Sequence, residues 1–471
     1  MDIENAVRLC TQKMADAQVS APATHAFIAN LRRVASGDLG LIPEAQLDAI
    51  DTLPRLCDLP EPSSQATPLL GQLAVLKLNG GLGTGMGLDK AKSLLVVRDQ
   101  RTFLDFIASQ IQDLRTRPGA DHLAFLLMNS FSTRADSLAY LERYSNLGLG
   151  QSLDFLQSQV PKVMAQSLEP ASSAEDPDLE WCPPGHGDIY PSLVSSGVLA
   201  RLLKQGIRYL FVSNSDNLGA SVDLRLLQHF AASGASFLME VAERTPSDRK
   251  GGHLARRKVD GRLALRESAQ CPTDDANAFQ DIARHRYFNT NNLWLQLDHL
   301  HDELEKRGGL LTLPLIRNQK TLNPTRKDSP KVLQLETAMG AAIECFQRSE
   351  ALVVSRTRFA PVKSTGDLLV LRSDACQVTS DHRIELAASR AGVPPEVTLD
   401  EKFYKNIADF EKAFAHGVPS LVKCRRLKVT GRFTFSSGVI CTGDVEWINL
   451  REEEQRIEPG IYGQDHQASK L

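Results

Sequence analysis

The sequence predicts an α/β protein built around an open, mainly parallel sheet with helices on both faces. Short apolar runs of strand length alternate along the middle of the chain with amphipathic segments of helical length. The strand candidates are residues 73–78, 125–128, 209–212 and 237–241. Polar residues directly follow several of these runs, as expected where ligands bind at the carboxyl ends of parallel strands.

The first predicted unit is an N-terminal helical segment over residues 1–65. Phe27, Leu31 and Val34 recur at helical spacing within it. The Pro- and Ser-rich stretch 59–68 follows and is typical of a linker. We therefore expect the sheet to begin after this linker.

A helix is predicted shortly after the first strand candidate. Phe103, Ile107 and Ile111 share one helical face. Thr102 precedes them, and Asp105 stands three residues later, which gives a partial capping box. This helix supports the alternation of strands and helices.

A glycine-dense loop follows the first strand candidate. Lys90 and Lys92 stand at its end. Without Cβ atoms, the backbone can approach an anion and direct N–H groups at it. The loop is not a Walker loop, because no glycine directly precedes a Lys-Ser or Lys-Thr pair, and Met86 occupies the third glycine position of a dinucleotide fingerprint. We predict a phosphate-binding loop, and a Gly-rich turn without a ligand remains the alternative. Its glycines are residues 80, 81, 83, 85 and 87.

Composition indicates a soluble enzyme rather than a nucleic-acid or membrane protein. The chain has 471 residues, 42% of them hydrophobic, which is enough for a large core in two or three domains. A formal net charge of −3 argues against a nucleic-acid surface. The N-terminus lacks a targeting pattern, so we expect cytoplasmic residence and no membrane partner. The eight cysteines form no CxxC pair, which argues against a zinc site.

The C-terminal part of the sequence has a different pattern of apolar and polar residues. Between residues 427 and 450, apolar residues alternate with polar ones, and Thr-Gly or Ser-Gly pairs interrupt them. A period near six favours the coils of a parallel β-helix. An array of antiparallel hairpins is the alternative on this pattern alone.

Seven blocks of sequence then carry a specific resemblance. In chain order, they are similar to the characteristic blocks of the eukaryotic-type UTP–glucose-1-phosphate uridylyltransferase family, and together they extend over roughly residues 70–370. The blocks are LNGGLGTGMG (78–87), WCPPGHGDIY (181–190), FVSNSDNLGA (211–220), KGGHL (250–254), FNTNNLW (288–294), LQLETAMGAAI (333–343) and RFAPVKSTGDLL (358–369).

The resemblance implies a Rossmann-like nucleotidyltransferase domain over residues 66–380 and a C-terminal domain with a left-handed parallel β-helix over 381–471. It implies transfer of uridylyl from UTP to α-D-glucose 1-phosphate, giving UDP-glucose and pyrophosphate. The expected chemistry is direct in-line attack with Mg²⁺ as cofactor, which needs alignment and charge neutralisation rather than a nucleophilic triad. We expect a monomer or a small homo-oligomer.

By the same resemblance, Lys92 and Lys363 are the expected phosphate-binding lysines. Asp216, at the end of a strand, is the expected Mg²⁺ ligand, and its alternative is an Asx turn or helix cap. Ala91 stands where the family usually has proline. A loop with a freer backbone is expected at that point.

The remaining implied site residues fall into a nucleotide set and a sugar set. Gln157 suits uracil because an amide donates and accepts at once. The nucleotide set is Leu78, Asn79, Gly80, Gly81, Gly83, Thr84, Met128, Gln157, Gly185 and Asn214. The sugar and phosphate set is His186, Glu240, Gly252, Asn289, Asn291 and Glu336.

Two other functions stay open from the sequence. A UDP-sugar pyrophosphorylase of broader or N-acetylhexosamine 1-phosphate specificity would use the same parts. A non-catalytic regulator that binds nucleotide sugars is the other, which the joint presence of Lys92, Asp216 and Lys363 disfavours.

Overall fold

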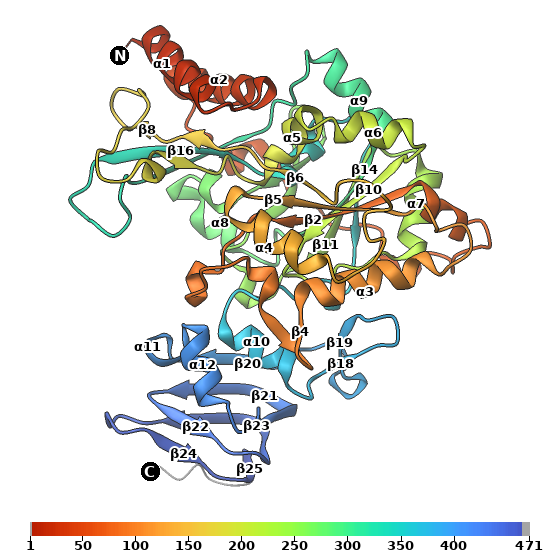
Figure 1. The fold of residues 1–471 in the computed structure, drawn as a ribbon, viewed down its shortest axis with the longest axis vertical. Coiled ribbons are helices and arrows are strands. Elements are labelled where there is room, and N and C mark those ends of the chain that lie inside the picture. Colours follow the sequence, from red (N-terminus) through yellow and green to blue (C-terminus); the bar gives the residue numbers. More distant parts are fainter. Residues whose placement is uncertain (1, 464–471) are drawn as a thin grey trace.

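The computed structural model describes residues 2–463, and its centre is a seven-stranded sheet (Figure 1). Every neighbouring pair of strands is parallel except the two pairs that contain β14, which runs antiparallel to both neighbours. The predicted open, mainly parallel sheet is confirmed, and so are all four strand candidates. From edge to edge the strands are β17 (Ser349–Val353), β11 (Phe237–Glu243), β14 (Tyr287–Gln296), β10 (Tyr209–Asn214), β2 (Leu73–Asn79), β5 (Ala124–Asn129) and β6 (Asp154–Leu156).

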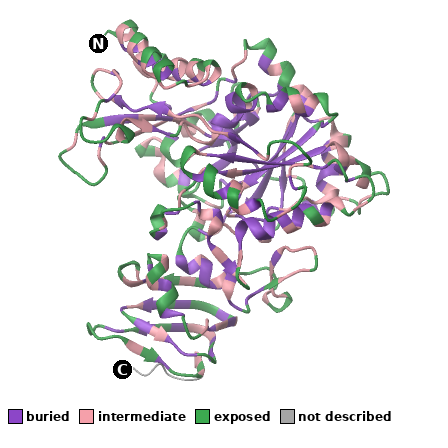
Figure 2. Ribbon diagram, in the orientation of Figure 1, coloured by how far each residue is buried: buried purple, intermediate pink, exposed green. Residues whose placement is uncertain are grey.

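Helices cover both faces of this sheet because successive residues of a strand point to opposite sides. Val75 of β2 packs in one hydrophobic core, whereas Ala74 and Leu76 pack in another. Figure 2 shows the buried sheet between helices whose outer surfaces are exposed. The first core includes α3 (Phe103–Arg115) and α7 (Leu224–Ser233), and the second includes α5 (Ile189–Ser195), α6 (Val198–Lys204) and α9 (Leu297–Lys306).

The capping box predicted for α3 is complete. Thr102 Oγ1 accepts from the backbone N–H of Asp105, and Asp105 Oδ2 accepts from the backbone N–H of Thr102. Two orphan N–H groups at the helix start are thereby satisfied.

Two helices, α1 (Ile3–Asp16) and α2 (Ala21–Ala35), form the helical part of residues 1–65. The rest of that segment contains only short 3₁₀ turns and the strand β1, because Gly37 and Gly40 adopt positive φ beyond the helix end. Both helices pack on neighbouring strands through a separate hydrophobic core. Those strands are β7 (Val160–Pro161), β9 (Trp181–Cys182), β8 (Val163–Met164), β16 (Lys331–Thr337) and β15 (Leu315–Thr321).

The C-terminal part contains two further sheets, ordered β20-β21-β23-β25 and β22-β24, and every strand pair in them is parallel. Among the described residues this excludes the antiparallel hairpin array. The strands and helices here are β20 (Glu396–Leu399), α11 (Glu401–Tyr404), α12 (Ile407–Ala413), β21 (Ser420–Thr430), β22 (Phe433–Phe435), β23 (Val439–Ile448), β24 (Gln455–Ile457) and β25 (Gly460–Gly463).

Short elements complete the fold. The boundary expected after residue 380 falls within the hairpin of β18 and β19, so chain contacts cross it. The remaining elements are β1 (Leu47–Asp48), β3 (Val96–Arg98), β4 (Arg101–Thr102), α4 (Phe131–Leu141), β12 (His253–Arg257), β13 (Leu263–Arg266), α8 (Ala276–Gln280), α10 (Thr365–Arg372), β18 (Cys376–Val378) and β19 (Ile384–Leu386).

Arg98 and Gln110 of the main sheet domain hold the segment that leads into the C-terminal part, and Gln110 Nε2 donates to the carbonyl oxygen of His382 at 3.0 Å. Arg98 Nη1 donates to the carbonyl oxygens of Leu371, Ser373 and Cys376. No helix within residues 2–463 combines the length and apolar character that crossing a membrane requires. All eight cysteines lie in the described part of the chain and are free thiols.

Gly431 provides a test of the stacked C-terminal strands. Its φ is +88°, and a Cβ there would overlap the carbonyl oxygen of Asn449 on the next strand level. Gly431→Ala should therefore destabilise the fold by the ~1–2 kcal/mol cost of a positive φ and a further ~1–3 kcal/mol from overpacking.

Gly392→Ala is the matched control, because Gly392 has φ +79° but no atom lies within 4 Å of the position that a Cβ would occupy. Urea denaturation of both full-length variants measures the difference. Equal losses in the two variants would contradict the described contact between Gly431 and Asn449.

Candidate active site

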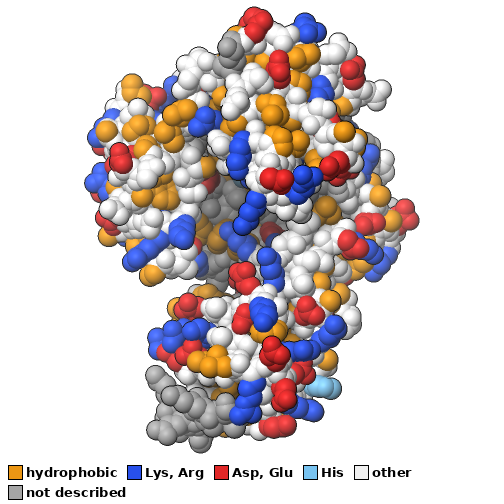
Figure 3. Space-filling view, turned by 90° about the vertical axis from the view of Figure 1, so that its left-hand side faces the viewer, with side chains coloured by type: hydrophobic (Ala, Val, Ile, Leu, Met, Phe, Trp, Pro, Cys, Tyr) orange, Lys and Arg blue, Asp and Glu red, His pale blue; other side chains and the backbone are white. Residues whose placement is uncertain are grey.

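The carboxyl ends of three adjacent strands bring the predicted phosphate residues to one edge of the sheet. Leu78 pairs with Asn214 across β2 and β10, and Asn79 pairs with Asn129 across β2 and β5. The Gly-rich loop therefore begins beside the turn that follows β10. The face shown in Figure 3 is hollowed above the C-terminal part, and Lys and Arg side chains stand at the rim of the hollow.

Lys92 and Asp216 form the central contact of this edge. The distance from Lys92 Nζ to Asp216 Oδ2 is 2.7 Å, and their side chains are 18% and 19% exposed. Asp216 Oδ1 is buried and has no hydrogen-bond partner within the described chain. A buried carboxylate oxygen without a partner is costly unless a ligand satisfies it. This oxygen is therefore available to a cation or a donor group.

The Gly-rich loop folds back so that Lys92 lies over its beginning. The backbone N–H of Lys92 donates to the carbonyl oxygen of Gly81 at 3.1 Å, and Leu82 pairs with Ala91 in an isolated bridge. Gly81 itself has open space around the position of a Cβ. No α-helix directly follows the loop, which agrees with rejecting a dinucleotide fingerprint.

The first glycine of the loop lies against the predicted uracil-binding amide. A Cβ on Gly80 would lie 2.6 Å from Gln157 Oε1. The backbone N–H of Gln157 donates to the carbonyl oxygen of Asn129 at 2.8 Å. Gly80 and Gln157, far apart in the sequence, are thus brought together at the strand ends.

Other members of the nucleotide set have internal roles in the described structure. Asn79 Nδ2 donates to Asn129 Oδ1 at 2.7 Å and to Ser137 Oγ at 2.9 Å, and its side chain is buried. Met128 is buried in the core between the strands, Gly83 packs on Leu88, and Thr84 is exposed. The buried members of this set hold the strand ends from which the loop begins.

Lys363 reaches the same edge by backbone pairing. Asn217 forms an isolated bridge with Pro361, and the backbone N–H of Val362 donates to the carbonyl oxygen of Asp216. The Lys363 ammonium lies 6.0 Å from the ring centroid of Phe359 and its side chain is exposed. The structure therefore aligns the two segments without a direct contact between Lys363 Nζ and Asp216.

Gly185 and His186 occupy a tight turn beside β16. Gly185 has φ +79°, and a Cβ there would overlap the backbone of Thr337 and crowd Glu336. Glu336 accepts from Asn318 Nδ2 at 3.0 Å. Only glycine fits this close approach of two backbones.

His186 is held as a neutral ring. Its Nδ1 accepts from the backbone N–H of Met339 at 2.9 Å, and burial lowers its pKa to about 4. The hydrogen of the neutral imidazole must then lie on Nε2. His186 can therefore donate one hydrogen bond from Nε2 to a ligand oxygen.

Glu240, predicted to bind the sugar, is instead the acceptor at the centre of a buried network. Its two oxygens accept from the Arg358 guanidinium at 2.7 Å each, from Trp294 Nε1 at 3.0 Å and from Asn292 Nδ2 at 3.1 Å. The side chain is 0% exposed. Four internal hydrogen bonds occupy this carboxylate, so the geometry does not support the direct sugar contact expected of Glu240.

Arg358 is a residue that the sequence did not single out, although it begins one of the quoted blocks. Its carbonyl oxygen accepts from Asn217 Nδ2 and from Asn292 Nδ2, and its Nη2 donates to the carbonyl oxygen of Ser221. One buried arginine thus joins the turn after β10 to β11 and β14. The sequence alone did not predict this role, because an arginine at the start of a block is not recognisable as a buried residue.

The NTNN segment forms a bulge in β14. The pairing with β11 shifts between Glu240 and Val241, and Asn291 adopts φ +60°. Asn289 Nδ2 donates to Asn291 Oδ1, and Asn289 Oδ1 accepts from the backbone N–H of Asn291. A strained conformation of this kind is typical of a ligand-binding site.

Gly252 lies against the carboxylate of Glu267, where a Cβ would come within 2.5 Å of Oε2. Burial raises the pKa of Glu267, and the positive charge of Lys363 opposes this rise. Lys363 and Gly252 therefore lie on the same side of the site.

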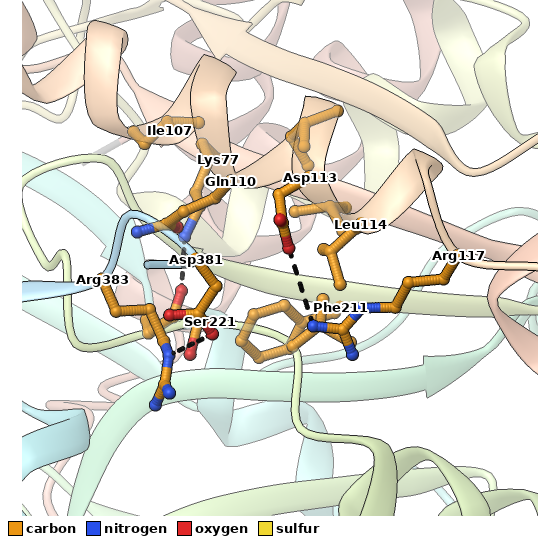
Figure 4. A pocket seen from close by; sticks show the side chains of 14 residues that line it. Lys77, Ile107, Gln110, Asp113, Leu114, Arg117, Phe211, Ser221, Asp381 and Arg383 are labelled. Carbon is orange, nitrogen blue, oxygen red and sulfur yellow. Dashed lines mark hydrogen bonds and ion pairs between the residues drawn. The ribbon is translucent and has the colours of Figure 1, made fainter. Parts of the chain in front are cut away.

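Lys77 is a second residue that the sequence did not single out. It is 2% exposed, and its Nζ donates to Ser213 Oγ and to the carbonyl oxygen of Ala220 at 2.7 Å each. Burial and then the nearby Arg358 charge lower its pKa to about 7, against the opposing effect of Glu240. Figure 4 shows it at the inner end of a narrow pocket below α3, with the Asp113–Arg117 and Asp381–Arg383 pairs beside it.

Metal binding by protein side chains alone has no support in the geometry. Within residues 2–463 no group of three or more His, Cys, Asp or Glu side chains is arranged to hold a metal ion. Asp216 belongs to no such group, and its Oδ1 is buried without a hydrogen-bond partner. A cation held mainly by substrate oxygens fits this arrangement.

Sequence comparison points to one family. The profile of the family described as UTP–glucose-1-phosphate uridylyltransferase matches residues 32–442. The enzyme of that name from Hordeum vulgare is 39% identical over 425 residues, covering 89% of this chain and 87% of the Hordeum protein. The enzyme from Saccharomyces cerevisiae is 41% identical over 377 residues, covering 80% and 74% of the two chains.

Solved structures show the same likeness over the whole fold. A variant of UDP-glucose pyrophosphorylase from Leishmania major, in complex with UDP-glucose, has a TM-score of 0.91 and 48% identity, and 97% of each chain is covered. UDP-glucose phosphorylase from Trypanosoma brucei has a TM-score of 0.88 and 46% identity, covering 97% of this chain and 98% of the other. The similarity therefore includes the C-terminal sheets.

Replacing Glu240 tests the buried network. Glu240→Gln removes the negative charge and leaves the Arg358 guanidinium buried without a counter-ion, so we expect a loss of about 3–5 kcal/mol in the free energy of unfolding. Glu243→Gln is the control on the same strand, because Glu243 pairs with Arg55 at 3.0 Å with both side chains about half exposed. Exposed pairs contribute at most ~1 kcal/mol. Urea denaturation showing similar losses for the two variants would contradict the network.

The lowered pKa of His186 predicts that the stability of the fold depends on pH. Its pKa lies near 4 in the folded state against 6.5 ordinarily, so the unfolded state binds more protons between these values. Stability contributed by neutral His186 is present above pH 6.5 and is lost as the pH falls toward 4.

The wild type should therefore lose its stability advantage over the variant His186→Gln as the pH falls from about 7 to about 4.5. The contributions of the other histidines are the same in both proteins and cancel in the difference. Urea denaturation at several pH values across this interval measures the difference. A stability difference independent of pH would count against the neutral, buried ring.

Proposed function

The chain belongs to the UTP–glucose-1-phosphate uridylyltransferase family, and we propose on that basis that it transfers the uridylyl group of UTP to α-D-glucose 1-phosphate. The products are UDP-glucose and pyrophosphate, and the reaction is reversible. The observation that carries this proposal is the family match over residues 32–442, which includes the Lys92–Asp216 contact at the sheet edge.

Chemistry at this site requires alignment and charge neutralisation. An oxygen of the sugar 1-phosphate attacks the α-phosphorus of UTP, the bond to the β-phosphate breaks, and pyrophosphate leaves in line. No bond to the protein forms. Lys92 neutralises the phosphate oxygens from the Gly-rich loop, and Lys363 does so from the opposite segment. Gly80 and Gly81 leave the backbone free to approach them.

Asp216 is the proposed protein ligand of Mg²⁺. Its unpartnered Oδ1 supports this assignment, since a carboxylate oxygen is a preferred ligand of that ion. Such an ion would supply positive charge to the phosphate oxygens. Lys92, now bonded to Oδ2, would turn to the phosphates when UTP binds.

The uracil and the hexose are assigned to two residue sets that meet at the Gly185–His186 turn beside Glu336. Gln157, beside Gly80, is proposed to read the uracil edge, with Leu78, Met128, Gly185 and Asn214 around it. His186 Nε2–H, Asn289 and Asn291 are proposed to bind sugar or phosphate oxygens, with Gly252 and Glu336 nearby. Glu240 acts on them through Asn292.

The C-terminal strands are proposed to wind as a left-handed parallel β-helix. Support comes from the pairing offsets, since Leu427 pairs with Val445 and Phe433 pairs with Gln455. These intervals suit coils of about three short strands each. The proposed functional units are residues 1–65, 66–380 and 381–471, with the second boundary at the β18–β19 hairpin.

Cytoplasmic residence is proposed from the thiol chemistry. All eight cysteines are free, and most of them are buried, which suits a reducing compartment. UTP and glucose 1-phosphate are the proposed partners, with the chain acting as a monomer or small homo-oligomer.

Pyrophosphate release tests the function directly. With a panel of nucleoside triphosphates and sugar 1-phosphates, we expect UTP with glucose 1-phosphate to give the highest kcat/KM. Equal rates with galactose 1-phosphate or N-acetylglucosamine 1-phosphate would instead support a broader UDP-sugar pyrophosphorylase. No release from any pair would leave a non-catalytic nucleotide-sugar binder.

Lys92→Ala tests the phosphate assignment. Loss of a preorganised charge at the reacting phosphates should lower kcat by at least ~10²-fold while the unfolding midpoint stays close to that of the wild type. Lys90→Ala is the matched control, because Lys90 is exposed two residues away and should keep wild-type kcat. Near-normal kcat in Lys92→Ala would refute the assigned role.

A further inference from the structure

A cavity of about 400 Å³ lies apart from the Gly-rich loop and is lined mainly by arginines among its charged groups. It opens between residues 38–42, the β12–β13 hairpin and the end of α9. Four arginines face two carboxylates across it, an excess of two positive charges. The charged lining residues are Arg33, Arg257, Arg262, Arg307, Asp38 and Glu344.

Three of these arginines converge on the end of the 3₁₀ segment η11 (Met339–Glu344). Arg257 pairs with the Glu344 carboxylate through Nε and Nη2, Arg262 Nη1 donates to the carbonyl oxygen of Glu344, and Arg307 Nη2 donates to that of Cys345. These bonds fix the three guanidinium groups around one point. Within residues 2–463, Arg257 Nη1, Arg262 Nη2 and Arg307 Nη1 take part in no hydrogen bond.

The other carboxylates that pair with these arginines lie outside the cavity lining. Asp260 is 3.4 Å from Arg262, and Glu303 is 3.2 Å from Arg307 and also pairs with Lys306. The side chains of Arg262 and Arg307 are 35% and 36% exposed, and ion pairs at such positions are weak. They leave positive charge available to a ligand in the cavity.

We propose that this cavity binds a small phosphate monoester. Guanidinium forks match the spacing of phosphate oxygens, and three fixed forks with free N–H groups can bind one phosphate together. The cavity is larger than a free phosphate requires, and its wall includes Leu41, Leu313 and Pro314, which suit a short organic group. The site lies outside the residues assigned to UTP and glucose 1-phosphate.

The segment η11 connects this cavity to the active site. Glu344 at its end lines the cavity, whereas the Met339 N–H at its start bonds His186 Nδ1. Between them, Gly340 lies so close to Asn289 that a Cβ would come within 2.7 Å of Nδ2. A ligand bound by Arg257 and Arg262 therefore acts on the groups that hold Glu344, at the end of the segment that contacts His186 and Asn289.

Binding is tested by calorimetry on the full chain, with glycerol 3-phosphate and inorganic phosphate as probes. We expect glycerol 3-phosphate to bind the wild type and Lys92→Ala alike, because Lys92 belongs to the other site. The double variant Arg262→Gln, Arg307→Gln should bind at least about tenfold more weakly, since two charge-assisted hydrogen bonds are lost.

Two control variants keep the binding test specific. Arg262→Lys with Arg307→Lys retains the charge but not the forks, so binding should be weakened less than by glutamine. Arg256→Gln removes an exposed arginine of β12 that does not line the cavity, and this variant should bind as the wild type does. No binding of glycerol 3-phosphate to the folded wild type, equal binding by the glutamine double variant, or binding of inorganic phosphate alone would overturn the proposal.

Coupling is tested separately, and only this arm depends on the proposed function. Saturating glycerol 3-phosphate should change the KM for glucose 1-phosphate by about fivefold in the wild type, and the effect should vanish in the glutamine double variant. Unchanged kinetics with the probe bound would refute the coupling through η11. An inactive enzyme that still binds the probe would refute the proposed function and leave the phosphate monoester site supported.

Discussion

The buried ion pair between Arg358 and Glu240 is the interaction on which the arrangement of the site depends. Glu240 lies on β11, its neighbours Asn292 and Trp294 lie on β14, and Arg358 lies in the segment that leads to Lys363. The carbonyl oxygen of Arg358 also holds Asn217, next to Asp216. An uncompensated charge here would be costly, so all of these segments are fixed together.

That constraint explains how two lysines distant in sequence come to one place. The Gly-rich loop, which follows β2, places Lys92 in contact with Asp216. The segment that begins at Arg358 places residues 361–363 beside Asp216 through the bridge between Asn217 and Pro361. Lys92 and Asp216 form an ion pair with 2.7 Å between Nζ and Oδ2. Both side chains remain partly exposed to water, so this pair contributes little stability and little free energy is needed to separate it.

The main sheet could be predicted from the sequence because its strands are short apolar runs, and the strand-end position of the loop followed from topology alone. Strand β14 could not be predicted in this way, since its polar NTNN bulge hides the period of two. Arg358 and Lys77 were missed for a different reason. Each is a charged residue whose burial depends on partners more than 100 residues away, and no local pattern encodes that.

The site residues named from motifs also fall into two groups: some are brought together as expected, and others are used in hydrogen bonds within the protein. Gly80 with Gln157 and Lys92 with Asp216 were named from motifs and are brought together by strand register. Asn79 and Glu240 were named from the same motifs, yet Asn79 Nδ2 and both Glu240 oxygens are occupied by internal hydrogen bonds. Residue type indicates that a group can bind a ligand, whereas only the three-dimensional hydrogen-bond network decides whether it is free to do so.

Lys92 and Asp216 together are proposed to form the triphosphate and cation site, and this is the central claim. Anomalous diffraction from crystals grown with UTP and Mn²⁺ tests it most directly. We predict Mn²⁺ bonded to Asp216 Oδ1 and to UTP phosphate oxygens, with Lys92 Nζ moved from Asp216 Oδ2 onto a phosphate oxygen. Mn²⁺ and the triphosphate bound elsewhere, with the Lys92–Asp216 contact intact, would contradict it.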